Sequence, residues 1–156
     1  MKLLFKQRIF SWFDSYDIYD ENGDIVYIVK GQLSWGHKLN IYNLSGEHIG
    51  TIKEEVITFL PKFTLYIGDR YVGEIKKELT FLKPKFHLNC KGWSIEGNYL
   101  EWDYTVVDSS NAPIMYASKQ VFNLADTYEI DVVNPEDSIY ALMIVLAIDI
   151  AKCSNN

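Results

Sequence analysis

The sequence has few cysteines and no excess of basic residues. Its two cysteines, Cys90 and Cys153, lie far apart and have no metal-ligand neighbours. This spacing argues against a disulfide scaffold and suits a reducing compartment. Aspartate and glutamate (21) outnumber lysine and arginine (15), which gives a net charge of -6. Because an acidic chain lacks the overall basic surface that binds nucleic acid non-specifically, we expect no nucleic-acid partner.

Long apolar runs are missing as well. The apolar residues 3–5 are followed at once by charged residues, so no signal-peptide core of about 7 residues forms there. The longest apolar run, residues 139–148, is closely flanked by aspartates, and it is shorter than the roughly 20 residues of a membrane span. We therefore expect no transmembrane segment and a cytoplasmic location, with any membrane contact being peripheral.

The sequence is rich in the residues that form strands and hairpins. It is 48% hydrophobic and 15% aromatic, which suits a single domain over residues 1–156 with a sizeable core. Short β-branched and aromatic runs alternate with turn residues from about residue 12 to 133, and Asn22-Gly23 is the clearest hairpin turn. We expect about twelve strands, with the four tryptophans and eleven tyrosines filling the core and pairing across the sheet.

Two internal repeats link these hairpins. Residues 49–55 (IGTIKEE) recur as residues 72–78 (VGEIKKE), and FLPKF recurs as FLKPKF, which gives a repeat unit of roughly 23 residues. Gly50 and Gly73 each share a strand face with an isoleucine. Two interpretations remain open: a closely approaching element requires these glycines, or they relieve twist and form bulges.

The C-terminal apolar run predicts a helix over about residues 135–153. Asn134 is a good cap, and Pro135 fits the first turn. Because the run is apolar on every helical face, protein must surround it. Its length of about 28 Å is comparable with the height of a barrel of medium strands. The sequence therefore predicts a mainly β fold, a closed antiparallel barrel around a central hydrophobic helix, which also removes exposed sheet edges.

Asp149 is the one residue of this helix in an electrostatically unfavourable position. Its carboxylate follows a long apolar run near the helix C-terminus, where it opposes the helix dipole. Three environments remain open: pairing with Lys152 one turn later, exposure to water at the barrel mouth, or burial against a lysine or arginine of the barrel.

Charge is unevenly distributed along the chain. Residues 62–91 hold seven basic and three acidic residues, a net charge of +4, whereas residues 92–137 hold nine acidic residues and one lysine. We expect a basic side and an acidic side. One hypothesis is that the basic side binds anionic lipid headgroups; the alternative is an ordinary solvated strand face. The candidate lipid-binding residues are Lys62, Arg70, Lys76, Lys77, Lys83, Lys85 and Lys91.

Signatures of catalysis or metal binding are not found. His37, His48 and His87 lack the spacing of a chelating pair. No serine sits in a nucleophile elbow, no glycine cluster matches a phosphate loop, and the carboxylates are scattered through turns. We expect a protein that is not an enzyme and holds no cofactor or metal.

Three segments resemble the LURP-one-related and phospholipid-scramblase-like proteins of the tubby-like superfamily. They are residues 16–31 with the motif YDIYDENG, residues 93–98 (WSIEGN), and the apolar helix that ends in aspartate at residues 137–149. The resemblance implies a twelve-stranded barrel around a central C-terminal helix. It also implies binding of phosphoinositide headgroups, as in tubby proteins, or association with membranes, as in scramblases. The chain lacks the proline-rich extension and the cysteine cluster of animal scramblases.

Two functions are therefore expected as alternatives. The first is a cytoplasmic, non-enzymatic module that binds anionic phospholipid at a membrane surface. The second is a small structural or protein-interaction barrel without lipid activity, which an exposed apolar patch outside the basic segment would favour. A lumen-binding carrier is disfavoured because the helix would fill the lumen.

Overall fold

The computed structural model describes residues 1–6, 15–81, 85–122 and 125–153. Within these residues the chain forms twelve strands, two 3-10 turns and one α-helix. The first six strands are β1 (Lys2–Lys6), β2 (Ser15–Tyr19), β3 (Ile25–Ser34), β4 (Gly36–Tyr42), β5 (His48–Glu54) and β6 (Lys62–Ile67). The other six are β7 (Arg70–Glu78), β8 (Lys85–Asn89), β9 (Ser94–Asn98), β10 (Asp103–Val107), β11 (Pro113–Phe122) and β12 (Ala125–Val132). The helical elements are η1 (Tyr99–Glu101), η2 (Pro135–Asp137) and α1 (Ser138–Cys153).

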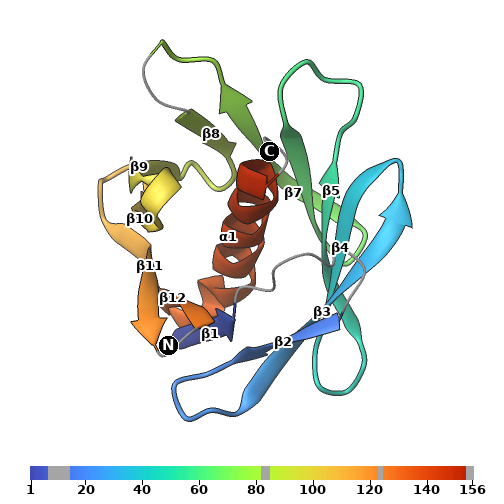
Figure 1. Cartoon of the computed structure of the whole chain (residues 1–156), viewed down its shortest axis with the longest axis vertical. Helices are drawn as coiled ribbons and strands as arrows, with labels where there is room; N and C mark the ends of the chain where they lie inside the picture. Colours follow the sequence, from blue (N-terminus) through green and yellow to red (C-terminus); the bar gives the residue numbers. More distant parts are fainter. Residues whose placement is uncertain (7–14, 82–84, 123–124, 154–156) are drawn as a thin grey trace.

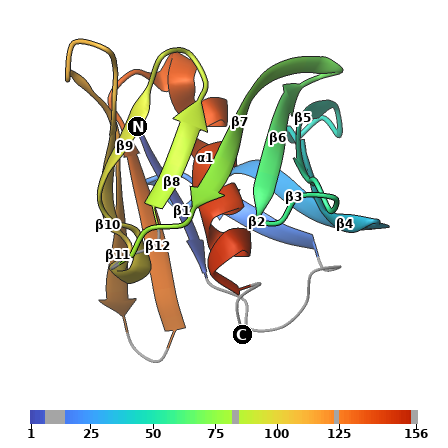
Figure 2. The ribbon, with the colours of Figure 1, turned by 90° about the horizontal axis from the view of Figure 1, so that it is seen from above.

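The strands form one antiparallel sheet that curls into a nearly closed barrel. The strand order is β8-β7-β6-β5-β4-β3-β2-β1-β12-β11-β10-β9. One half of the sheet contains β1 to β8 and the other contains β9 to β12, and consecutive strands are neighbours within each half. The two halves join where β1 pairs with β12, from Lys2 opposite Asp131 to Lys6 opposite Thr127. The edge strands β8 and β9 come together at the remaining seam. Figures 1 and 2 show α1 running through the ring of strands, so the predicted barrel with a central helix is confirmed.

The helix fills the barrel as its all-apolar sequence requires. Residues 141–148 of α1 are each at most 1% exposed, and they pack against inward side chains such as Ile52, Leu65 and Ile130. Asn134 caps the preceding turn, because its side-chain oxygen accepts a hydrogen bond from the Glu136 amide at 3.2 Å. The predicted first turn from Pro135 is a 3-10 turn, and the α-helix proper begins at Ser138.

The two repeated glycines meet different neighbours. A Cβ at Gly50 would lie 3.3 Å from the Met143 sulfur of α1, so Gly50 admits the helix. A Cβ at Gly73 would lie 2.4 Å from the carbonyl oxygen of Asn89 and 2.7 Å from the Cys90 Cβ, so this glycine admits the end of β8. A register shift also lies beside each glycine, in the β4–β5 and β6–β7 pairs. Both open interpretations, close approach and bulge, therefore apply.

Replacing Gly73 by Ala is expected to destabilise the protein more than replacing Gly50 by Ala. At Gly73 the new methyl group overlaps backbone atoms, and such overpacking costs about 1–3 kcal/mol. At Gly50 the contact is with a flexible methionine side chain, which can turn away. Urea unfolding followed by circular dichroism measures both free energies of unfolding. Equal values for the two variants would contradict this account.

The barrel has two different ends, defined by the direction of α1. At the end where α1 begins, Tyr27 hydrogen-bonds Ser138 through their hydroxyl groups at 2.8 Å. At the end where α1 finishes, the Nζ of Lys152 lies 4.8 Å from the ring centre of Trp102. We call these the helix-start end and the helix-finish end. The β3–β4, β5–β6 and β7–β8 hairpin connections all lie at the helix-finish end (Figure 1).

Candidate functional site

The predicted basic residues do not form one patch. Arg70 lies at the helix-start end, where it begins β7. Lys91 also lies at that end and pairs with Asp137 at 2.7 Å, with its Nζ over the rings of Trp93 and Tyr140. These contacts give Lys91 a structural role in holding the start of the helix.

The remaining predicted residues lie on β6, β7 and β8 or next to them. Lys62 begins β6 and pairs with Glu74 at 2.9 Å, and this hydrogen bond raises the pKa of Lys62 and lowers the pKa of Glu74. Lys76 and Lys85 are exposed near the helix-finish end, whereas Lys77 is half-buried there. Lys83 lies outside the described residues.

Strand pairing places lysines directly opposite lysines on the outer face of the barrel. Lys38 of β4 lies opposite Lys53 of β5, and Lys62 lies opposite Lys76. Like charges at directly opposite positions destabilise a sheet. Within the described ranges, Glu74 pairs with Lys62, but Lys38, Lys53 and Lys76 have no carboxylate oxygen within 4.0 Å. We call Lys38, Lys53, Lys62, Lys76 and Lys85 the basic row.

Two of the five lysines of the basic row, Lys38 and Lys53, were not among the predicted residues. Lys38 and Lys53 lie outside residues 62–91, so a window of charge along the chain does not contain them. The β4–β5 register pairs Lys38 with Lys53, and the strand order β4-β5-β6-β7 places both beside the strands of the predicted lysines. The alternation of inward and outward side chains along a strand could have found these two lysines. Lys38 adjoins the buried Leu39 and Lys53 adjoins the buried Ile52, so both lysines must point outward.

Apolar side chains project from the hairpin connections at the helix-finish end. Trp35, Ile57, Phe59 and Phe81 are 90%, 98%, 91% and 105% exposed, and Leu79 is 75% exposed. Turns are normally built from polar residues and glycine. We call Trp35, Val56, Ile57, Phe59, Leu79 and Phe81 the apolar tips. The prediction that the tryptophans fill the core is therefore wrong for Trp35, although Trp93 and Trp102 are buried, and Trp12 lies outside the described residues.

Trp35 is exposed for a local reason. It occupies the turn between Ser34 and Gly36, which are paired residues at the ends of β3 and β4. Gly36 has a φ of 92° and supplies the left-handed backbone that this turn needs. A side chain at such a turn points away from the barrel, whatever its hydrophobicity.

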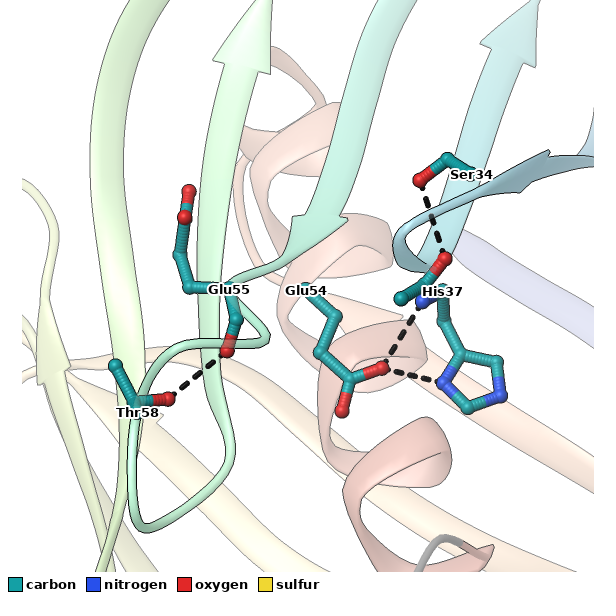
Figure 3. A network of polar contacts seen from close by, with 6 residues as sticks. Ser34, His37, Glu54, Glu55 and Thr58 are labelled. Carbon is teal, nitrogen blue, oxygen red and sulfur yellow. Dashed lines mark hydrogen bonds and ion pairs between the residues drawn. The ribbon is translucent and has the colours of Figure 1, made fainter.

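Polar contacts hold the first two tips together. Figure 3 shows Glu54 at the end of β5 accepting hydrogen bonds from the His37 amide at 3.0 Å and contacting the His37 ring nitrogen Nδ1. Within the β5–β6 connection, the Thr58 hydroxyl contacts the carbonyl oxygens of Glu55 and Leu60 at 2.9 and 2.7 Å. The tips are therefore fixed in position relative to the strands.

The opposite end of the barrel is polar. Its turns contain Asp20, Asn43 and Asp108, and each of these side chains accepts two hydrogen bonds from backbone amides of its own turn. Such Asx turns close a hairpin through local hydrogen bonds to a polar side chain. This end carries the isolated exposed apolar residues Leu44 and Val133, whereas large apolar side chains on three neighbouring connections are found at the helix-finish end.

Asp149 lies in the last turns of α1, partly buried. Burial raises its pKa from 3.8 to about 6, against the opposing charge of Lys152. The neighbouring Tyr104 hydroxyl is buried and has no hydrogen-bond partner among the described residues. Burial and the charge of Asp149 hold the pKa of Tyr104 well above its usual value. Of the three environments left open for Asp149, the structure shows the influence of Lys152 inside a largely buried site. The charge of Lys152 lowers the pKa of Asp149, but burial raises it by more.

The histidines and Cys90 have structural surroundings. His48 contacts the Thr51 hydroxyl at 2.8 Å, and His87 lies 3.9 Å from Glu78. Cys90 is buried, which raises the pKa of its thiol. In the part of the chain that the structure describes, no group of three or more His, Cys, Asp or Glu residues could hold a metal ion. No described helix is long and apolar enough to cross a membrane.

Comparison with known proteins identifies the family of this barrel. The family model described as LURP-one-related matches residues 1–149. The chain belongs to the LURP-one-related family. One related protein is the uncharacterised protein YxjI of Bacillus subtilis. The two sequences are 29% identical over 150 residues, which cover 96% of this chain and 92% of YxjI. The predicted membership is confirmed.

A solved structure has the same fold as this chain. An X-ray structure of a protein from Arabidopsis thaliana superposes with a TM-score of 0.60 at 17% sequence identity. The match covers 95% of this chain and 91% of the plant protein. At this identity the likeness establishes the fold alone, and function must come from the surface features described above.

Proposed function

We propose that this LURP-one-related protein is a non-enzymatic module that binds peripherally to anionic lipid surfaces. The observation that carries the proposal is the basic row, in which Lys38 faces Lys53 and Lys62 faces Lys76. A folded chain with a net charge of -6 gains nothing in stability from directly opposed lysines. An anionic surface would remove their mutual repulsion, so binding gives the arrangement a physical reason.

The strength of such binding follows from the number of lysines. Each lysine or arginine near an anionic membrane surface contributes about 1 kcal/mol, and the effect fades within a Debye length. The basic row holds five lysines, of which Lys62 already has a carboxylate partner in Glu74. The binding is therefore expected to be moderate and sensitive to salt.

We propose that the protein is not an enzyme because its barrel has a filled interior. The lumen of the barrel, where a substrate pocket would lie, is occupied by the buried side chains of α1. Cys90 is buried, and burial raises the pKa of its thiol, which disfavours the reactive thiolate at this position.

A vesicle sedimentation assay tests the proposal. Purified protein is mixed with vesicles of phosphatidylcholine alone or with phosphatidylserine, at about 50 mM and about 500 mM salt. We expect binding to the anionic vesicles at low salt and much weaker binding to the neutral ones. The variant Lys53→Glu/Lys76→Glu should bind anionic vesicles at least about tenfold more weakly, a loss of about 1.4 kcal/mol or more.

The matched control is Lys119→Glu, a charge reversal on β11 in the other half of the sheet. It should bind nearly as the unmodified protein does. Equal and negligible binding to both kinds of vesicle at low salt would rule out the proposal. Equal losses in binding free energy per reversed lysine in the two variants would show that net charge alone matters, without a role for the basic row.

A protein-interaction barrel is the second candidate, and the exposed apolar tips favour it. Trp35, Ile57 and Phe59 lie outside residues 62–91 in sequence, as that alternative requires, but Leu79 and Phe81 lie within them. The apolar tips inside and outside residues 62–91 project from the same end of the barrel, beside the basic row. Absence of lipid binding in the sedimentation assay would leave this candidate as the preferred one.

A further inference from the structure

We infer that the apolar tips insert into the interfacial region of an anionic bilayer, with the basic row held at the level of the lipid headgroups. The inference deepens the proposed function and rests on it. It assigns a docking surface, the helix-finish end of the barrel, and an orientation in which α1 points its C-terminus toward the membrane. Four observations lead to it.

The first observation is the asymmetry between the two ends. Three consecutive hairpin connections at the helix-finish end present large apolar side chains, whereas three connections at the helix-start end are Asx turns, and the exposed apolar residues there, Leu44 and Val133, are isolated. Isolated exposed apolar residues are ordinary on a protein surface. Six of them gathered on neighbouring connections at one end form a feature that requires an apolar partner.

The second observation is the continuity of the tips. A Cβ at Gly36 would lie 2.6 Å from the Val56 Cγ1, so the β3–β4 and β5–β6 tips touch. The Lys77 amide of β7 donates a hydrogen bond to the Pro61 carbonyl oxygen at 2.9 Å, which ties the third hairpin to the second. The tips therefore form one connected edge that can meet a surface together.

The third observation is the shape and chemistry of that edge. On these three adjoining hairpins Trp35, Ile57, Phe59 and Phe81 are each at least 90% exposed and so hardly pack against one another, whereas the core of a protein interface is packed as closely as a protein interior. A bilayer accommodates separate projections because lipid chains flow around them. Tryptophan, phenylalanine and leucine are the residues that peripheral proteins bury at the boundary of headgroups and acyl chains.

The fourth observation is the position of the charges. Lys38 lies two residues beyond Gly36, and Lys53 and Lys62 lie at the two ends of the β5–β6 connection. Lysine can extend its charged group to the headgroups while its hydrocarbon stem covers apolar surface.

Glu54, Glu55 and Glu78 lie at the same edge, but Glu54 contacts His37, Glu55 accepts a hydrogen bond from Thr64, and Glu78 lies opposite Lys85. The basic row behind the apolar edge therefore still matches the layered chemistry of an anionic bilayer. This charge complementarity favours a membrane over an apolar protein surface.

Quenching of Trp35 fluorescence tests the insertion directly. Protein is bound to phosphatidylserine–phosphatidylcholine vesicles that carry bromine atoms on their acyl chains, and Trp35→Phe is measured in parallel. Trp93 and Trp102 are buried, so the difference between the two proteins reports on position 35. We expect quenching in the unmodified protein and clearly less in Trp35→Phe. Binding without any difference in quenching would overturn the inference and leave the proposed function intact.

A second variant tests the other tips. Ile57→Ser/Phe59→Ser/Leu79→Ser/Phe81→Ser changes only exposed side chains, so an unchanged circular dichroism spectrum and melting temperature are expected. It should retain low-salt binding to anionic vesicles in part and lose at least tenfold in binding at high salt, where the apolar contribution dominates. The matched control is Leu44→Ser/Val133→Ser, two exposed apolar residues outside the tips, which should bind as the unmodified protein does.

The outcomes separate the two proposals. If the unmodified protein does not bind anionic vesicles at all, both proposals fail. If it binds and the tip variant binds equally well at both salt concentrations, only the insertion fails. If vesicle binding is absent and the tip variant selectively loses a protein that co-purifies with the unmodified chain, the edge is a protein interface and the insertion is wrong.

Discussion

Replacing Leu142 by Ala is expected to lower the free energy of unfolding by about 3–5 kcal/mol. Leu142 is 0% exposed and lies on the central helix, within a cluster that also contains inward residues from both halves of the barrel. Removing a buried leucine side chain loses its transfer free energy and leaves a cavity that its neighbours fill only in part. Since whole domains are stable by only about 5–15 kcal/mol, the loss is a large share of the total.

Urea unfolding measured by circular dichroism and by tryptophan fluorescence checks this value. Val133→Ala is the matched control, because Val133 is 58% exposed just before the helix, and its loss should change stability by less than about 0.5 kcal/mol. A similar small effect at Leu142 would show that the interior is loosely packed around the helix.

Replacing Asp149 by Asn is expected to stabilise the protein at neutral and alkaline pH. Burial raises the pKa of Asp149 from 3.8 to about 6. Between about pH 4 and about pH 6, the folded protein therefore retains a proton that the unfolded chain has already released. Linkage then requires the contribution of Asp149 to stability to fall as pH rises from about 4 to about 6, and to remain unfavourable above that range.

The size of the effect follows from the shift. A difference of about 2 pKa units corresponds to about 3 kcal/mol, as an order of magnitude. Asparagine has nearly the same shape and carries no charge, so Asp149→Asn should gain up to that amount at pH 8 and much less at pH 4. Guanidinium unfolding at several pH values measures the gain.

Glu101→Gln serves as the control, because Glu101 is an exposed carboxylate in η1. It should follow the pH dependence of the unmodified protein closely. If Asp149→Asn also ran parallel to the unmodified protein over pH 4–8, the carboxyl of Asp149 would have to be solvated in the folded state.

Local pattern was sufficient to predict most of the fold. An apolar run that covers every helical face cannot be stable at a surface, so residues 139–148 had to be enclosed. Turn residues such as Asn22-Gly23, where Gly23 has a φ of 87°, set the hairpins. Alternation within each strand then decided which side chains enter the core. These are short-range rules, and each can be read within a few residues.

The candidate site followed from the sequence only in part. The charge window at residues 62–91 included Lys62, Lys76 and Lys85 of the basic row, but it also included Lys91, which holds the start of the helix. Whether a lysine has a carboxylate partner depends on residues that are distant in sequence. Lys91 and Asp137 are 46 residues apart and lie 2.7 Å from each other in the fold.

The sequence by itself determined the architecture: hairpin strands around an apolar helix that water cannot surround. Only the tertiary structure decided which surface could bind a partner. Strand register set lysines opposite lysines, and hairpin packing brought Trp35, Ile57 and Phe81 to one end of the barrel. The physical reason is that burial of an apolar segment depends on its own pattern, whereas a surface is made by residues from many segments, whose relative positions are fixed only when the sheet closes.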